Sequence, residues 1–105
     1  MVEYSLRLDS IFASLSDPTR RDILARVAHS ELTIGELVKH YDMSFAAVSK
    51  HLKIMERAKL VIKRKEGRKQ MVSLAPGALK CADEYLEQYR QMWQSRYDKL
   101  DALIN

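Results

Sequence analysis

Nine of the chain's 18 Lys and Arg residues fall within residues 44–74, and this clustering is the strongest chemical signal in the sequence. Only Glu56 and Glu66 oppose them, so the segment has a net charge of +7. Residues 1–43 are net −2 and residues 75–105 are net −1, so this one segment supplies all of the chain's positive excess of +4. A localised basic stripe is typical of a surface that binds a polyanion. The segment therefore indicates contact with a phosphate backbone.

The residue types that perform catalysis are present but are not arranged for it. The sequence contains no Gly-rich phosphate loop, no Gly-x-Ser-x-Gly and no His-Glu-x-x-His. Its one Cys, Cys81, excludes an internal disulfide and any Cys-x-x-Cys zinc or redox motif. His29, His40 and His51 fall on three different predicted elements, so nothing gathers them around a metal. We therefore expect no enzymatic activity, no cofactor and no metal site.

Apolar residues at helical spacing predict helices both before and within the basic segment. A first helix ends near Leu15, and a second covers residues 18–29, with Asp17 as its N-cap and Pro18 at its first position. Thr33 caps a short helix over residues 33–40. A turn then leads to Ser44, which caps a helix of about 14 residues whose buried side holds Val48, Leu52 and Met55.

A β-hairpin and a long helix complete the predicted order. The residues on either side of Glu66-Gly67 are predicted to form two strands of a hairpin, because Gly supplies the positive φ that a tight hairpin turn needs. After Pro76-Gly77, apolar residues step by three or four as far as Ile104 and predict one helix over residues 78–103. At 1.5 Å per residue that helix would be ~39 Å long, so we expect it to extend beyond its own domain. The fold class is mainly α with a small β-hairpin, in the order α-α-α-α-β-β-α.

Length and composition bound the class of protein. A chain of 105 residues, 47% hydrophobic and 30% charged, fits one globular domain. It has no apolar run near the roughly 20 residues that a membrane-spanning helix needs. Residues 1–10 contain Glu3 and Asp9 and lack the apolar core of a signal peptide. We expect a cytoplasmic protein without a membrane partner.

Several motifs, in order, resemble the ArsR/SmtB family of winged helix-turn-helix repressors. The run Leu15-Ser16-Asp17-Pro18-Thr19-Arg20-Arg21-Asp22-Ile23-Leu24 resembles the start of the family's conserved region, and Glu31-Leu32-Thr33-Ile34-Gly35-Glu36-Leu37 continues the match. The run Ser44-Phe45-Ala46-Ala47-Val48-Ser49-Lys50-His51-Leu52-Lys53 is similar to the family's recognition helix, and Ala58-Lys59-Leu60-Val61 with the basic hairpin follows. The resemblance covers residues 6–74 closely. It implies one domain over residues 1–105, with the helix-turn-helix at 33–57 and the wing at 61–74.

The resemblance and the charge pattern together predict a sequence-specific transcriptional repressor that binds double-stranded DNA at an inverted-repeat operator. A recognition helix presents its N-terminal residues to base edges in the major groove. Small Ala side chains allow close approach, and the wing cations would meet phosphates or the minor groove. The residues expected to contact DNA are Ser44, Phe45, Ala46, Ala47, Ser49, Lys50, His51, Lys53, Arg64, Lys65, Arg68 and Lys69. For Ser44 a role as N-cap alone, and for His51 a hydrogen bond within the fold, remain alternatives.

The aromatic stripe on the last helix would be exposed in a monomer, and a large exposed apolar patch usually marks a partner. A two-fold homodimer is the commonest solution. Residues 1–15 and 78–104 are the expected dimerisation helices. The expected interface residues are Leu8, Ile11, Leu86, Tyr89, Trp93, Tyr97 and Leu100.

The metal-sensing positions of the family are not filled by ligands in this sequence. The resemblance aligns the two Cys of the family's thiolate site with Thr33 and Gly35, neither of which binds a soft metal. The family's zinc site needs His on the last helix, and no His follows His51. Three alternatives stay open: a small-molecule or protein effector, a repressor with an unrecognised metal or thiol inducer acting through Cys81, and a winged-helix module that binds proteins.

Overall fold

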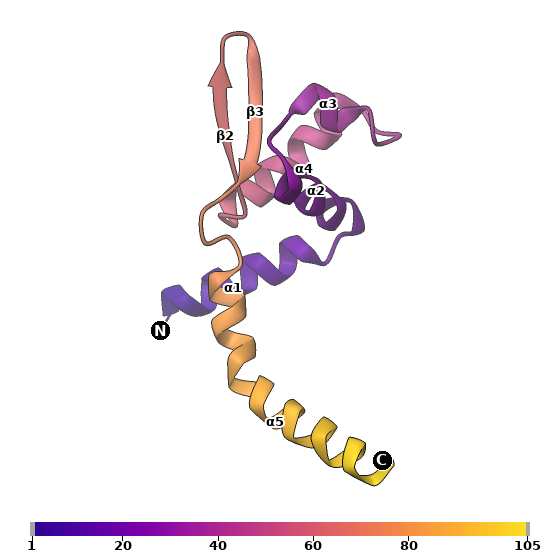
Figure 1. The fold of residues 1–105 in the computed structure, drawn as a ribbon. Coiled ribbons are helices and arrows are strands. Elements are labelled where there is room, and N and C mark those ends of the chain that lie inside the picture. Colours follow the sequence, from indigo (N-terminus) through magenta and orange to yellow (C-terminus); the bar gives the residue numbers. More distant parts are fainter. Residues whose placement is uncertain (1, 105) are drawn as a thin grey trace.

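A computed structural model describes residues 2–104; Met1 and Asn105, the two ends of the predicted domain, lie outside the described residues. The elements are α1 (Val2–Leu15), α2 (Pro18–His29), β1 (Leu32–Thr33), α3 (Ile34–Val38), α4 (Phe45–Arg57), β2 (Val61–Glu66), β3 (Lys69–Leu74) and α5 (Lys80–Ile104). In Figure 1 the β2–β3 hairpin projects from one end of the body and α5 extends from the other. This arrangement is a winged helix-turn-helix and confirms the predicted fold class.

Helix α2 begins and ends where its flanking residues predict. The Asp17 carboxylate accepts a hydrogen bond from the Arg20 backbone N–H at 3.0 Å, and Pro18 occupies the first turn. The cap and the proline together satisfy or remove donors that the first helical turn leaves without partners. The predicted bounds, residues 18–29, are confirmed.

The core lies where α1, α2, α3, α4 and the base of the hairpin meet. Its apolar side chains come from every one of these elements, and those with no exposed surface are Ile11, Ile23, Leu37, Val48, Leu52, Met55, Leu60 and Val72. Burial of apolar side chains is the main favourable term in folding. These side chains therefore fix how the helices and the wing sit against one another.

The wing belongs to a three-stranded sheet rather than an isolated hairpin. The strand order is β1-β3-β2, all antiparallel, with Leu32 opposite Val72 and Thr33 opposite Met71. We expected Thr33 only to cap a helix over residues 33–40; that helix is shorter, Ile34–Val38, and a two-residue strand precedes it. The extra strand joins the helix-turn-helix to the wing.

A two-residue connection closes the hairpin. Strands β2 and β3 pair from Val61 opposite Leu74 to Glu66 opposite Lys69, which leaves Gly67 and Arg68 between them. Gly67 has a φ of +63°, a backbone conformation that glycine adopts without steric cost. The predicted turn at Gly67 is therefore confirmed.

Helix α5 extends well beyond the body, as its length predicts. The Cα radius of gyration is 17.4 Å, whereas a compact chain of 100 residues has about 13 Å. The helix begins at Lys80 and not at Ala78, because Gly77, at a φ of +66°, ends a turn in which the Ala78 N–H donates to the Ala75 carbonyl. The expected helix is otherwise present.

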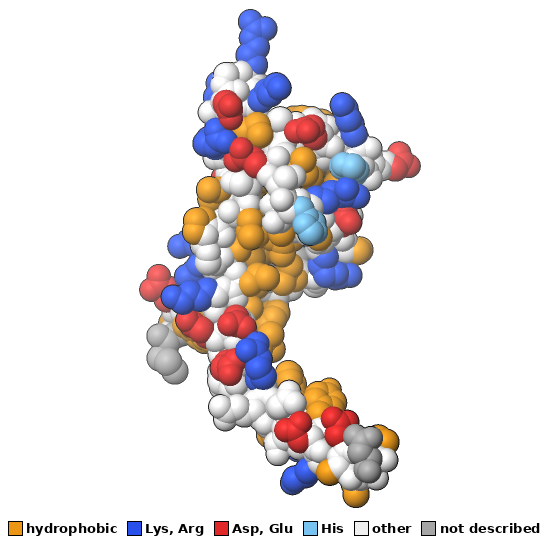
Figure 2. Space-filling view, viewed as in Figure 1, with side chains coloured by type: hydrophobic (Ala, Val, Ile, Leu, Met, Phe, Trp, Pro, Cys, Tyr) orange, Lys and Arg blue, Asp and Glu red, His pale blue; other side chains and the backbone are white. Residues whose placement is uncertain are grey.

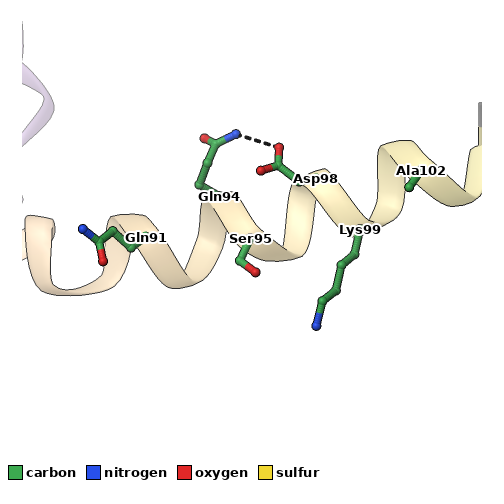
Figure 3. A pocket seen from close by; sticks show the side chains of 6 residues that line it. All are labelled: Gln91, Gln94, Ser95, Asp98, Lys99 and Ala102. Atoms are coloured by element: carbon green, nitrogen blue, oxygen red, sulfur yellow. Dashed lines mark hydrogen bonds between the residues drawn. The ribbon is translucent and has the colours of Figure 1, made fainter.

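The two sides of α5 differ sharply in chemistry. Its apolar side carries exposed Leu86, Trp93, Tyr97, Leu100 and Ile104, and Met92 and Leu103 are exposed at the margin of that side. Successive residues of an α-helix are 100° apart around its axis, and this spacing gives α5 a polar side opposite the apolar one. A shallow depression on the polar side is lined by Gln91, Gln94, Ser95, Asp98, Lys99 and Ala102. Figure 3 shows this polar side, where Gln94 donates a hydrogen bond to Asp98 at 3.1 Å. Both sides of this part of α5 are exposed, and the apolar side is the one that favours burial against a partner.

Helix α1 packs on the first turns of α5, and its exposed apolar residues are not the ones expected at the dimer interface. Leu8 and Ile11, expected at a dimer interface, point into the core of their own chain, with exposures of 9% and 0%. Val2, Leu6 and Phe12 are the exposed large apolar residues of α1 instead. The Phe12 ring meets Tyr85 edge-on with ring centroids 6.0 Å apart, which continues the aromatic stripe of α5 onto α1.

Candidate nucleic-acid interface

Helix α4 is held at both ends by local hydrogen bonds. The Ser44 hydroxyl accepts from the Ala47 backbone N–H at 3.0 Å, which is the N-cap that the sequence predicts. At the other end Lys59 has a φ of +60°, and the Leu60 N–H donates to the Met55 carbonyl at 3.0 Å. This pattern is a Schellman motif, in which a residue with positive φ closes the last turn.

One side of α4 is buried and the other carries cations. Val48, Leu52 and Met55 have no exposed surface, as the spacing predicts. On the far side, stepping by four, three and four, lie the exposed residues Ala46, Lys50, Lys53 and Arg57. Arg57 was missing from the predicted contacts, although its spacing from Lys53 places it on the same face. The outward face of α4 is therefore a straight row of three positive charges.

The predicted contact residues at the N-terminus of α4 differ in accessibility. Ser44, Phe45 and Ala46 are exposed, whereas Ala47 and Ser49 are half-buried. His51 does not share the outward face, because its side chain is only 17% exposed and its Nδ1 lies 3.1 Å from the Arg20 guanidinium. His51 thus makes a contact within the fold, the alternative that the sequence left open.

The Arg20 side chain joins three helices. Its Nε donates to the Ser14 carbonyl at 2.7 Å and its Nη2 to the Ala13 carbonyl at 3.2 Å, both at the end of α1. Its Nη1 contacts His51 of α4, while its own backbone belongs to the first turn of α2. Arg20 therefore fixes the recognition helix relative to α1.

The carboxylate of Asp17 strengthens this junction. The pKa of Asp17 lies below its usual value, first because the carboxylate accepts the Arg20 backbone N–H; burial opposes this shift, and the nearby Arg20 charge adds to it. Its Oδ2 is 4.0 Å from His51 Nδ1. The ionised form of Asp17 is thus the one that the fold favours.

A second polar tie holds the turn between α3 and α4. The Tyr41 hydroxyl donates to Asp22 Oδ2 at 2.6 Å, and Arg26 Nε donates to the same oxygen at 2.8 Å. These hydrogen bonds, Tyr41 first, lower the pKa of Asp22, and burial raises the pKa of Tyr41 to about 12. The turn that precedes the recognition helix is thereby attached to α2.

The wing separates its cations into paired and unpaired groups. Arg64 is held by Glu31 and Glu66, which raise its pKa, and Lys63 Nζ lies 3.3 Å from Glu56. Within residues 2–104, no carboxylate forms an ion pair with Lys65, Arg68 or Lys69 at the end of the hairpin. Figure 2 shows Lys and Arg side chains gathered there. Of the four predicted wing contacts, these three are the ones without an ion-paired carboxylate among the described residues.

A groove runs between the start of α4, the start of α3 and the wing. It is lined by Thr33, Ile34, Gly35, Glu36, Phe45, Ser49, Lys63, Arg68, Lys69 and Gln70. The structure thus brings the exposed N-terminus of α4 and the wing cations to one side of the molecule. That side combines the exposed N-terminus of a helix with positive charge on the neighbouring wing. Such a surface suits the binding of a duplex polyanion.

Among residues 2–104, no group of three or more His, Cys, Asp or Glu side chains is placed to hold a metal ion. Thr33 and Glu36 instead form a capping box, in which each side chain accepts the other's backbone N–H. None of the described helices is both long and apolar enough to cross a membrane.

Comparison with known protein families finds a match for the part of the chain that contains α2, α3 and α4. Residues 17–63 match the family model described as the arsR family of bacterial regulatory proteins. The HTH-type transcriptional regulator Rv2034 of Mycobacterium tuberculosis is 37% identical over 81 residues, which cover 77% of this chain and 76% of the relative. The transcriptional repressor SdpR of Bacillus subtilis is 32% identical over 60 residues, 57% of this chain and 67% of the relative.

Solved structures share the fold. The crystal structure of an ArsR family transcriptional regulator superposes with a TM-score of 0.78 at 28% identity, covering 87% of this chain and 94% of that one. A solution structure from Mycobacterium bovis, described as a homodimeric winged helix-turn-helix DNA-binding domain, gives a TM-score of 0.65 at 20% identity, covering 81% and 82%. The second likeness is one of fold alone.

Arg20→Ala should destabilise the protein by about 2 kcal/mol, because hydrogen bonds from a charged donor contribute roughly 1.5–3 kcal/mol. Urea unfolding at a fixed protein concentration measures the change. Arg21→Ala is the matched control: the neighbouring side chain is exposed and makes one hydrogen bond, to the Leu15 carbonyl at 2.8 Å. Equal losses in the two variants would show that Arg20 does not join the helices.

Proposed function

Since the chain belongs to the ArsR family of bacterial regulatory proteins, we propose that it is a transcriptional repressor that binds an inverted-repeat operator as a homodimer. The relatives are regulators, and SdpR is described as a repressor. The observation that carries the proposal is that the most basic segment of the chain forms both of the elements expected to meet DNA. The segment 44–74, with its net charge of +7, supplies both the outward face of α4 and the wing.

In this proposal α4 enters the major groove with its N-terminus foremost. Ser44, Phe45, Ala46, Ala47 and Ser49 then lie toward base edges; the Ser44 hydroxyl, although it accepts from Ala47, still has a proton to donate. Lys50, Lys53 and Arg57 face phosphates along the groove. Lys65, Arg68 and Lys69 meet the backbone or the minor groove beside it.

Two of the residues predicted to contact DNA take other roles. His51 positions α4 through Arg20 rather than reading a base. Arg64 is neutralised by Glu31 and Glu66, so it shapes the wing more than it attracts DNA. The assignment of His51 follows from its contact with Arg20. The assignment of Arg64 follows because a cation that is already paired gains less from a phosphate.

The dimer forms through the uncovered apolar side of α5 together with Leu6 and Phe12 of α1. Seven large apolar side chains on α5 are exposed in the single chain, and patches of this kind mark interfaces. Leu86, Tyr89, Trp93, Tyr97 and Leu100, all expected at the interface, lie on this side.

The regulator acts in the cytoplasm and does not respond to metal through the positions that the family uses for that purpose. Thr33 and Gly35 offer no soft ligand, and Thr33 is engaged in its capping box. Release from the operator then depends on a small molecule, a protein or the concentration of the chain itself, with a metal or thiol inducer that acts elsewhere in the chain as the alternative. No enzymatic step forms part of this function.

The affinity for the operator should fall steeply with salt, because each phosphate contact releases a counterion. Lys53→Ala removes one contact per protomer, so the slope of log affinity against log salt should decrease by about two in the dimer. Fluorescence anisotropy with an operator selected from random duplexes measures both slopes. Lys99→Ala, on the polar side of α5, is the control and should leave the slope unchanged. A flat salt dependence in the unmodified protein would contradict DNA binding.

Trp93→Glu should convert the dimer to a monomer, because it places a charge within the apolar side of α5, where Trp93 is 47% exposed in the single chain. Sedimentation velocity reports the change. Ser95→Glu adds the same charge two residues away on the polar side, four residues before Lys99, and should remain dimeric. If the unmodified chain sediments as a monomer and ignores DNA, a winged-helix module for binding proteins becomes the better description.

A further inference from the structure

We propose that Phe45 reads the 5-methyl group of a thymine in the major groove and so sets a sequence preference of the operator. The inference rests on the proposed function, because it assumes that α4 enters the groove. Beyond the proposed function, the inference names one residue that recognises a base and the chemical group on that base that it contacts. Phe45 is the first residue of α4 and the only aromatic residue in segment 44–74.

The Phe45 ring is exposed at a position that is otherwise well determined. The side chain is 57% exposed, while the backbone there is fixed by the Ser44 cap, whose hydroxyl accepts from Ala47 at 3.0 Å. A single exposed apolar residue is common on protein surfaces and needs no explanation by itself. The reason to assign it a role is what surrounds it.

Phe45 lines the groove between α4 and the wing together with Arg68 and Lys69, which have no ion-paired carboxylate among the described residues, and Lys63, which is paired with Glu56. On its other side, Lys50 and Lys53 follow along the outward face of α4. Cations on both sides would hold phosphates on either side of the ring. With both strands held this way, the ring faces the floor of the groove, where base edges lie, rather than the backbone. The neighbouring Ala46 is small enough to allow that approach.

The chemistry of the ring limits what it can recognise. A phenyl group has no hydrogen-bond donor or acceptor, so it cannot read the polar edge of a base pair. The major-groove edge of a base pair offers one apolar group, the 5-methyl of thymine. Contact with Phe45 therefore favours thymine over cytosine at one position of each half-site. A 5-methylcytosine would provide the same methyl group.

The test removes the methyl group without changing any hydrogen bond. In the selected operator, each thymine of the half-site is replaced in turn by deoxyuridine, and affinity is measured for the full chain and for Phe45→Ala. The unmodified protein should lose about fourfold in affinity per half-site at one position, the contribution of burying one methyl-sized group. Phe45→Ala should be indifferent to the same replacement. Placing 5-methylcytosine at that position should recover affinity relative to cytosine in the unmodified protein only.

Ile62→Ala is the matched control, since Ile62 is an exposed apolar residue of the same basic segment, on the wing strand β2. It should keep the full sensitivity to deoxyuridine. Thermal unfolding confirms that Phe45→Ala folds, and Phe45→Leu provides a second variant that retains an apolar side chain. Equal responses of the unmodified protein and Phe45→Ala to every replacement overturn the inference while leaving DNA binding intact. Absence of DNA binding by the unmodified protein overturns the proposed function itself.

Discussion

The one-sided burial of α4 is the constraint on which the rest of the structure depends. Val48, Leu52 and Met55 have no exposed surface because they pack into a core shared with α1, α2, α3 and the base of the wing. Once that side of α4 is buried, helical geometry leaves Lys50, Lys53 and Arg57 on the opposite side. The cationic face is thus a consequence of the apolar one. Rotation of α4 to bury a lysine would require desolvation of its charge.

Polar contacts then refine what the core sets. Arg20 ties the end of α1 to His51, and Tyr41 ties the turn before α4 to Asp22 of α2. These contacts hold α4 to α1 and the turn before it to α2. In the wing, Lys63 and Arg64 are bound to carboxylates, whereas the cations near Gly67 remain exposed. Positive charge therefore remains uncompensated on the outward face of α4 and at the end of the wing.

The elements with strong local signals could be predicted from the sequence. Asp17 and Ser44 mark helix starts through hydrogen bonds that each makes within three residues, and Pro18 does so through its fixed φ in the first turn. Gly67 marks a turn through its own backbone. Strand β1 was missed because its two residues carry no periodicity and depend on pairing with Val72 and Met71. Leu8 and His51 show the same limit for side chains. Spacing indicates that a face is apolar or polar, but the neighbour that it meets is decided by tertiary packing.

The central claim is that α4 and the wing form the surface that binds duplex DNA. Amide chemical-shift changes in the isotope-labelled protein, followed by NMR during titration with the selected operator, test it most directly. The structure predicts the largest changes at residues 44–50 at the start of α4 and at residues 65–69 at the end of the wing, with small changes along the polar side of α5. Changes concentrated on α5, with α4 and the wing unaffected, would contradict the account.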